Sequence, residues 1–303
     1  MKIPLFRGII TVITTPFDGQ GTINYDVLEK HIEFLLRNGV HAILPGGSTG
    51  EYYAQSVEER RETLKFVADK VAARVPLYAG TTSIRPSETI ELSDYAQSLG
   101  YEAVMVAAPA YALPDTGELI AHFRNIADNI ELPIILYNFP ARTGVDMNPD
   151  FLEGIADVRS ICAIKESSGS MGRYYQHLML YPHLQRICGF DDQALDQFLW
   201  GSKCWIAGAS NFLPAEHVAL YDACVVKWDW ERGRELMMTM MPLIYLLENG
   251  GKYIHYVKYG CELAGIPVGE MRPPMGPLTS GEKENFARLY NNLKAAKIGL
   301  EAA

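Results

Sequence analysis

The chain of 303 residues lacks the marks of a secreted or membrane-spanning protein. It contains no stretch of about 18 uninterrupted apolar residues, and the segment from Met1 to Arg7 has no long apolar core of a signal peptide. Its cysteines are odd in number, form no C-x-x-C pair, and fall in part within apolar, strand-like runs (Cys162, Cys188, Cys204, Cys224 and Cys261). We therefore expect buried reduced thiols and a cytoplasmic location.

The sequence also lacks the motifs of metal- and nucleotide-dependent enzymes. It has no H-E-x-x-H, no clustered cysteine and histidine, no P-loop lysine and no G-x-G-x-x-G after a strand-like run, so nothing in it supports zinc, ATP or NAD. Asp191 and Asp192 could suggest a cation site, but the side chains of two adjacent acids point different ways, so we interpret them as caps of a helix that starts near Gln193. A formal net charge of −9 argues against nucleic acid or an anionic membrane as a main partner.

What the sequence does contain is a regular alternation of apolar runs and amphipathic segments. Its composition, 48% hydrophobic and 21% charged, is that of an ordinary globular protein. Eight runs suit buried strands, and helix-like segments such as 25–37, 57–73, 86–99 and 116–129 separate most of them. The alternation predicts an α/β fold of the (β/α)8 TIM-barrel type rather than an open doubly wound sheet. The predicted strands are 8–14, 42–45, 77–80, 103–108, 134–137, 161–165, 186–189 and 205–208.

The strand signal ends near residue 225. The segments 228–250, 252–264 and 280–297 have helical patterns instead, and no clear flexible linker precedes them. We therefore predict a catalytic barrel domain over residues 1–225 and a C-terminal helical segment over residues 226–303.

Tyr137 and Lys165 end two consecutive strand-like runs and are 28 residues apart, which suits one strand–helix repeat. In a parallel sheet they would lie at matching ends of neighbouring strands. A lysine in an apolar strand is costly to bury as a cation, so its pKa falls and it presents a free amine that attacks a ketone to form a Schiff base. A nearby tyrosine hydroxyl can move the protons of that step. The alternative is a strand-end lysine that extends to solvent beside a packed tyrosine.

Other polar groups follow the predicted strands at the same edge, where the active site of a barrel lies. The glycines of residues 46–51 permit tight turns, and the hydroxyls of Ser48 and Thr49, with nearby backbone N–H groups, would hold a carboxylate. Further strands lead into Tyr111, Arg142, Lys165 and residues 208–211.

The glycine-rich turn also matches the G-x-S-x-G motif of serine hydrolases, with Ser48 as the nucleophile. That motif passes directly into a helix, whereas residues 51–55 precede the helix-like run here. His217 and His255 lie in helix-like contexts, where a packing or surface role is expected. A barrel that binds sugar acids without catalysis is a further alternative, because fold does not fix function.

Three spaced motifs resemble the dihydrodipicolinate synthase and N-acetylneuraminate lyase family. They are Gly-Gly-Ser-Thr-Gly-Glu at 46–51, Tyr-Asn-Phe-Pro-Ala-Arg-Thr-Gly at 137–144 and Ile-Lys-Glu-Ser at 164–167, and the resemblance extends from Phe6 to the C-terminal helices. It implies a (β/α)8 barrel with a C-terminal helical segment and a homotetramer that is a dimer of dimers. It also implies a reaction without metal or cofactor, through a Schiff base between Lys165 and pyruvate or another 2-oxo acid.

The resemblance assigns a role to each matching residue at the reaction centre. Lys165 would be the nucleophile, and Tyr137 would be the proton-transfer group near the imine. Ser48 and Thr49 would hold the carboxylate of the oxo acid and help to relay protons.

It also assigns residues to the pocket wall and to a second substrate. Backbone near Ile206 and Gly208 would line the pocket. In the synthase branch, Arg142 would bind the carboxylate of an incoming aldehyde such as aspartate semialdehyde, which a guanidinium fork suits. Tyr111 would be lent across a subunit interface.

A few positions separate the branches of this family. Synthases usually have threonine at the position of Ser48, and the serine–threonine form resembles the lyases. Synthases also commonly have a second tyrosine at the position of Ala110, whereas Arg142 favours an acidic acceptor. Val57 and Arg60 stand where lysine-inhibited synthases have histidines, so feedback by lysine is not expected. We predict a 2-oxo-acid lyase, with synthase-like condensation ahead of a catabolic aldolase or dehydratase acting on 2-keto-3-deoxy sugar acids or hydroxy-oxo acids.

Overall fold

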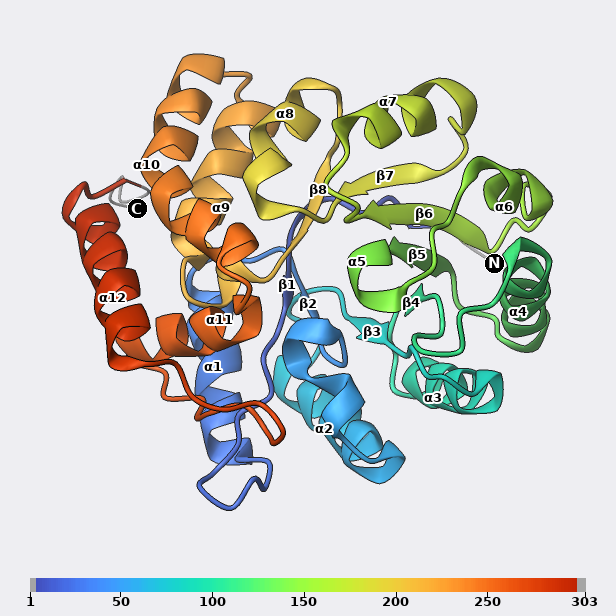
Figure 1. Ribbon diagram of the computed structural model, residues 1–303, viewed down its shortest axis with the longest axis horizontal. Coiled ribbons are helices and arrows are strands. Elements are labelled where there is room, and N and C mark those ends of the chain that lie inside the picture. Colours follow the sequence, from blue (N-terminus) through green and yellow to red (C-terminus); the bar gives the residue numbers. More distant parts are fainter. Residues whose placement is uncertain (1–3, 299–303) are drawn as a thin grey trace.

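Eight parallel β-strands form the centre of the computed structural model, which describes residues 4–298 (Figure 1). Their order is β2-β1-β8-β7-β6-β5-β4-β3, and a parallel bridge between Ile43 and Leu77 joins the two ends of this order. The predicted (β/α)8 barrel is therefore confirmed. The strands are β1 (Gly8–Val12), β2 (Ala42–Leu44), β3 (Tyr78–Gly80), β4 (Ala103–Ala107), β5 (Ile134–Asn138), β6 (Ile161–Glu166), β7 (Gln185–Cys188) and β8 (Cys204–Ala207).

Burial explains why these strands could be predicted from the sequence. Every strand residue is buried except the first two of β7. Strands covered on both faces are continuous apolar runs in the sequence, and the predicted strand ends agree with the observed ones to within about two residues.

Helices cover the outside of the barrel and begin at recognisable caps. The side chains of Asn24, Ser56 and Asp115 accept hydrogen bonds from the first turns of α1, α2 and α4. The four outer helices named from the sequence are confirmed. The barrel helices are α1 (Tyr25–Arg37), α2 (Val57–Val71), α3 (Pro86–Ser98), α4 (Thr116–Asn129), α5 (Pro140–Thr143), α6 (Pro149–Gly154), α7 (Met171–Leu180), α8 (Ala194–Leu199) and α9 (Pro214–Tyr221).

Alternate strand residues face the interior of the barrel. Tyr137 on β5 and Ala163 on β6 belong to one buried cluster. The same cluster includes Ile135 of β5, Ile187 of β7 and Ile206 of β8. Because side chains alternate along a strand, Lys165, two residues after Ala163, faces the same interior. The opposite face of the sheet packs beneath the helices in two larger clusters.

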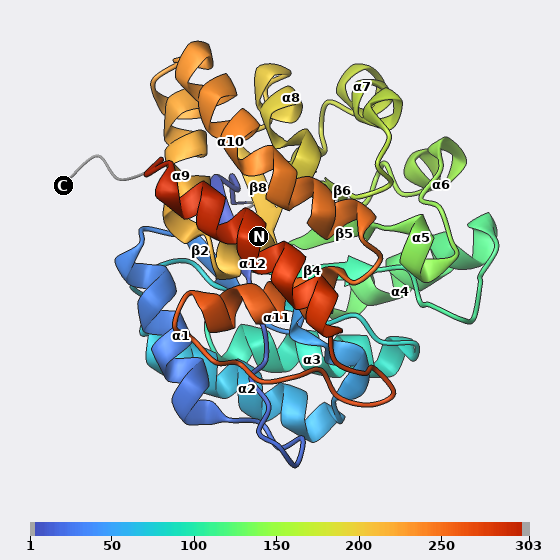
Figure 2. The same cartoon turned by 60° about the vertical axis from the view of Figure 1, so that its left-hand side comes forward.

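Three helices follow the barrel, as predicted for the C-terminal segment: α10 (Trp230–Asn249), α11 (Tyr253–Leu263) and α12 (Ser280–Ala295). Figure 2 shows α12 lying across α10 and α11. Their apolar faces belong to the same core as Trp205 of β8. The division into a barrel domain (1–225) and a helical segment (226–303) stays a prediction. Residues 1–3 and 299–303, at the outer ends of these ranges, lie outside the described part of the chain.

All five cysteines are buried and free, as expected from their sequence contexts. Burial raises the pKa of Cys162 and of Cys261 to about 12, which keeps both thiols protonated and weakly reactive. Within residues 4–298, no helix combines the length and the apolar character needed to cross a bilayer.

Candidate active site

A cavity of about 550 Å³ is lined by residues at or just after the ends of β2, β4, β5, β6, β7 and β8, together with residues of α10 and α11. The carboxyl ends of parallel barrel strands meet at one face, which explains why residues distant in the sequence converge there. Seven of the eight predicted site residues line this cavity: Ser48, Thr49, Tyr137, Arg142, Lys165, Ile206 and Gly208.

Tyr137 and Lys165 are direct partners in the ladder between β5 and β6. The Lys165 Nζ atom lies 4.3 Å from the centre of the Tyr137 ring, and each residue is only 6% exposed. Burial lowers the pKa of Lys165 from 10.5 to about 8, against the opposing effect of Asp191 and Glu248. The alternative of a lysine that extends to solvent is wrong, since its amine is buried among the residues that line the cavity.

The phenol of Tyr137 remains protonated at neutral pH. Burial raises its pKa well above the ordinary value, and a hydrogen bond with Ser48 only partly opposes this effect. The pair therefore combines a proton donor with an amine whose free form is accessible near neutral pH.

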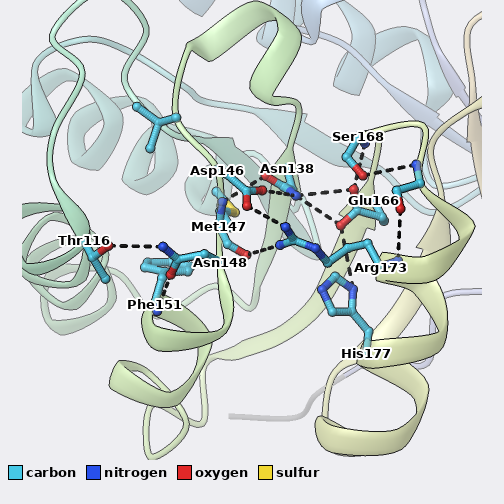
Figure 3. A network of polar contacts seen from close by, with 12 residues as sticks. Thr116, Asn138, Asp146, Met147, Asn148, Phe151, Glu166, Ser168, Arg173 and His177 are labelled. Carbon is cyan, nitrogen blue, oxygen red and sulfur yellow. Dashed lines mark hydrogen bonds and ion pairs between the residues drawn. The ribbon is translucent and has the colours of Figure 1, made fainter.

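A buried polar network fixes the strand ends behind this pair (Figure 3). Asn138 Nδ2 donates to Glu166 Oε2 at 3.1 Å and to Asp146 Oδ1 at 3.2 Å. Arg173 of α7 pairs with Asp146 at 2.5 Å, and the backbone N–H of Ser168 donates to Glu166 Oε1 at 2.7 Å. Because Asn138 and Glu166 directly follow Tyr137 and Lys165, the network holds the two reactive side chains in register.

The Ser48 turn does not have the geometry of a hydrolase nucleophile. Ser48–Gly50 form a single 3₁₀ turn, and the next α-helix starts only at Val57. The lining residues of the cavity, within the described chain, include no histidine. His217 instead stacks on Trp205 with ring centres 4.4 Å apart, which is the packing role expected of it.

Residues from the C-terminal segment hold this turn in place. Glu51, which follows the turn in a left-handed conformation (φ 57°), forms a fully buried ion pair with Lys258 of α11 at 2.6 Å. The backbone N–H of Arg272 donates to the other oxygen of Glu51 at 3.1 Å, and its side chain pairs with Glu59 at 2.5 Å. The turn that presents Ser48 is thus held by contacts with Lys258 and Arg272, which lie more than 200 residues later in the sequence.

Arg142 and Tyr111 differ in their relation to the cavity. Arg142, in the short helix α5, lines its exposed edge and forms no ion pair with the described residues. Tyr111 is 92% exposed, has a φ of 69° and is not among the lining residues. The structure therefore does not bring Tyr111 into the site of its own chain.

Among the lining residues that were not predicted as site residues are two acids and a tyrosine: Asp191, Glu248 and Tyr253. The interpretation of Asp191 as a helix cap is wrong, because α8 has no side-chain cap and Asp191 is 2% exposed. Its carboxylate accepts hydrogen bonds from Trp205 Nε1 at 2.9 Å and from the Tyr253 hydroxyl.

Glu248, in the last turn of α10, accepts a hydrogen bond through Oε1 from the Asp191 backbone N–H at 2.8 Å. Burial, and next the Asp191 carboxylate, raise the pKa of Glu248 well above its ordinary value. Strand ends in the sequence do not point to Glu248 or Tyr253, because both residues lie in helices that follow the barrel.

Known proteins share the fold and length of this chain. The model of the Dihydrodipicolinate synthetase family matches residues 5–293. The 4-hydroxy-tetrahydrodipicolinate synthase of Geobacter metallireducens is 34% identical, over 94% of this chain and 98% of that protein. YagE of Escherichia coli K12, provisionally named a 2-dehydro-3-deoxy-D-gluconate aldolase, is 33% identical over 96% of this chain and 98% of YagE. The dihydrodipicolinate synthase of Acinetobacter baumannii, solved in complex with pyruvate, has a TM-score of 0.89 at 28% identity, covering 96% of this chain and 99% of that one.

The fold, the cavity and these similarities define a (β/α)8-barrel lyase. Both the synthases and the sugar-acid aldolase match this chain over nearly its whole length. The chain belongs to the dihydrodipicolinate synthetase family, as its three motifs predicted.

Proposed function

We propose that this lyase forms an imine between Lys165 and pyruvate or a related 2-oxo acid and then joins or separates a carbon–carbon bond. The observation that carries the proposal is the buried Lys165 amine, 4.3 Å from the Tyr137 ring centre and inside the cavity. The pyruvate complex of the Acinetobacter synthase supports pyruvate as the first substrate.

Each residue near Lys165 has a part in this chemistry. The amine attacks the ketone carbon, the ketone oxygen takes up protons and leaves as water, and Tyr137 moves those protons. The Ser48 and Thr49 hydroxyls hold the carboxylate of the oxo acid. Loss of a proton from the methyl carbon then gives an enamine, the nucleophile for a second substrate. The imine supplies the electron sink, so the proposed reaction needs no metal or cofactor.

Reductive trapping tests the imine. Incubation with pyruvate and borohydride should add one pyruvate-derived group to the wild-type chain, located on Lys165 by peptide mass measurement. Lys165→Ala should give no adduct, and Lys203→Ala, which removes another lysine of the chain, should label like the wild type. Survival of the adduct in Lys165→Ala would contradict the mechanism, and a wild type without any adduct would favour the non-catalytic binding protein.

The second substrate is proposed to be an acidic aldehyde, as in synthase-like condensation with aspartate semialdehyde. Arg142 supports an acidic second substrate, because its guanidinium lines the cavity edge and has no anionic partner among the described residues. Its fork is suited to bidentate binding of a carboxylate. Turnover of pyruvate with aspartate semialdehyde is the test, and an inert semialdehyde would remove this branch.

A second candidate is cleavage or dehydration of a hydroxylated 2-oxo acid, such as a 2-keto-3-deoxy sugar acid. Asp191, Glu248 and Tyr253 favour it, since they place oxygen groups that can bind substrate hydroxyls on the cavity wall. The similarity to YagE supports the same branch. Release of pyruvate from 2-dehydro-3-deoxygluconate would show this activity.

The assembly and location belong to the same proposal. A homotetramer, a dimer of dimers, would give the exposed Tyr111 a place at a subunit interface, where it would reach a neighbouring site. Light scattering tests the tetramer, and activity recovered by mixing Lys165→Ala with Tyr111→Phe subunits tests the lent tyrosine. Five free buried thiols support a cytoplasmic location.

A further inference from the structure

The Lys165 amine has apolar surroundings at close range. Its Nζ atom lies 4.3 Å from the centre of the Tyr137 ring, and its stem packs on Gly189, where an added Cβ would lie 2.7 Å from Lys165 Cγ. Ile206, which is 1% exposed, lines the same cavity. A substrate joined to this buried amine therefore has its first carbons held away from bulk water.

The charged groups that act most on the amine are acidic. Among the described residues that line the cavity, the cations are Lys165 and Arg142, and the acids are Asp191 and Glu248. After burial, the strongest influences on the pKa of Lys165 are Asp191 and then Glu248, and both raise it. Arg142 is exposed at the edge of the cavity, where its Cζ atom lies 6.0 Å from the centre of the Phe139 ring.

The proposed function places a single carboxylate beside the imine. The C1 carboxylate of the 2-oxo acid binds at Ser48 and Thr49, and Arg142 binds the carboxylate of the acceptor. In aspartate semialdehyde that carboxylate is three bonds beyond the aldehyde carbon, which is the carbon that bonds to C3 of pyruvate. A carboxylate attached directly to C3 takes the place of the aldehyde carbon, so it falls short of Arg142 and finds no other cationic side chain among the described lining residues.

We infer that this chain also decarboxylates 2-oxo acids that carry a carboxylate on C3, of which oxaloacetate is the simplest. The inference rests on the proposed function, because it uses the same imine on Lys165. A carboxylate that is removed from water, lacks a cationic side chain and meets the field of the Asp191 carboxylate is destabilised, and loss of CO₂ removes its charge. The imine accepts the electron pair that the departing CO₂ leaves behind.

The electrons and protons of this reaction balance. The Lys165 amine and the C2 ketone form the iminium and release water. The C3–C4 bond then breaks, its electron pair becomes the C2=C3 bond of an enamine, the C=N π pair moves onto nitrogen, and C4 leaves as CO₂. C3 takes up one proton, and water then releases pyruvate and restores the amine. The sum is one oxaloacetate dianion and one proton converted to pyruvate and CO₂.

This cleavage needs fewer groups than aldol cleavage does. An aldol substrate must lose its hydroxyl proton to a base as the carbon–carbon bond breaks, whereas the carboxylate of oxaloacetate is already ionised. The one proton transfer, to C3, is the reverse of the methyl deprotonation in the proposed function. Lys165 and the proton carrier of the imine chemistry are therefore sufficient, and the balance calls for no oxidant or reductant.

Initial rates of pyruvate formation from oxaloacetate test the inference, in buffer with EDTA because free metal ions also decarboxylate this acid. The wild type should exceed the buffer blank by about tenfold or more, and Lys165→Ala should match the blank. Lys203→Ala, which removes an exposed lysine, is the control and should keep the wild-type rate. 2-Oxoglutarate carries its second carboxylate one carbon further on, where the imine cannot accept the electron pair, so it should release no CO₂.

Reductive trapping shows which bond has broken. Cyanoborohydride with oxaloacetate should leave a pyruvate-derived group on Lys165, lighter by one CO₂ than a group from intact oxaloacetate. An excess of ¹³C-labelled pyruvate marks any adduct that forms from free pyruvate, so an unlabelled adduct comes from oxaloacetate itself. Lys165→Met keeps the length of the side chain and should give neither adduct nor decarboxylation. Its melting temperature separates lost chemistry from lost folding.

Two results overturn the inference while the proposed function stands. One is a wild type that forms the pyruvate adduct but converts oxaloacetate no faster than Lys165→Ala does. The other is accelerated decarboxylation that Lys165→Met retains, which assigns the activity to another group of the protein. A wild type that forms no adduct with pyruvate refutes the proposed function itself, and with it this inference, so the two failures are distinguishable.

Discussion

Asn138 and Glu166 hydrogen-bond to each other one residue beyond Tyr137 and Lys165, with Nδ2–Oε distances of 3.1 and 3.3 Å. The bond joins β5 to β6 on the outer face of the sheet, opposite the cavity. Asn138 also accepts a hydrogen bond from the Met147 backbone N–H at 3.1 Å. One amide side chain thus connects the reactive strand ends to the loop that follows α5 (Figure 3).

Asn138→Ala should destabilise the protein by about 2–4 kcal/mol, because it removes a donor from the buried Glu166 carboxyl and leaves the Met147 N–H without its acceptor. Urea unfolding at pH 7 measures the loss. Asn129→Ala, which removes an exposed amide at the end of α4, is the control and should change stability by under about 0.5 kcal/mol. A loss at Asn138 no larger than that of the control would contradict the role given to this network.

Imine formation should depend on pH through Lys165. Only the free amine attacks a ketone, and the pKa of Lys165 is lowered to about 8. The trapping rate with pyruvate and cyanoborohydride should therefore rise from pH 6 and level off above about pH 8. An ordinary lysine would continue to gain rate up to about pH 10, so a midpoint in that range would show that burial does not activate this amine.

Arg142→Gln should raise the KM for an acidic aldehyde by about tenfold to a hundredfold, because it removes a charge-assisted pair with the carboxylate. The yield of the pyruvate adduct should not change, since the pyruvate carboxylate is proposed to bind at Ser48 and Thr49 instead. Arg288→Gln, an exposed substitution on α12, is the control. Equal kinetics for Arg142→Gln and Arg288→Gln would remove Arg142 from acceptor binding.

Lys258→Met should cost about 3–5 kcal/mol of stability, since it leaves the fully buried Glu51 carboxylate without its cation. The double variant with Glu51→Leu should recover much of this loss. Lys65→Met breaks an exposed pair with Asp69 and should change stability far less than Lys258→Met. Urea unfolding compares the variants, and a single variant as stable as Lys65→Met would mean that the buried pair contributes little.

Much of the fold and the part of the site wall formed by strand ends could be predicted from the sequence. Strands such as β4 and β5 are buried on both faces and therefore appear as apolar runs, and their ends placed Tyr137, Arg142 and Lys165 at one edge. The wall formed by Glu248 and Tyr253 could not be found this way, because helix positions carry no signal for the end of a strand. Their place depends on how α10 and α11 pack against the barrel.

For Asp191 the sequence does carry a signal, but the signal indicates the wrong role. Two adjacent acids before a helix fit a capping pattern, and only the contacts with Trp205 and Tyr253 reveal that the side chain faces inward. The exposure of Tyr111 is a third case, since the proposed role at a neighbouring subunit would leave no trace in the packing of its own chain.

The buried cysteines can report local opening of the barrel, because a thiol reagent reaches them only when the barrel opens. Cys188 and Cys204 lie close enough to Lys165 to influence its pKa, and neither thiol is exposed. A thiol reagent should titrate none of the five cysteines in the native protein and all five in urea. The rate at which Cys188 and Cys204 become labelled under native conditions would measure how often the barrel opens locally around the Lys165 amine. A ligand trapped on Lys165 should lower this labelling rate.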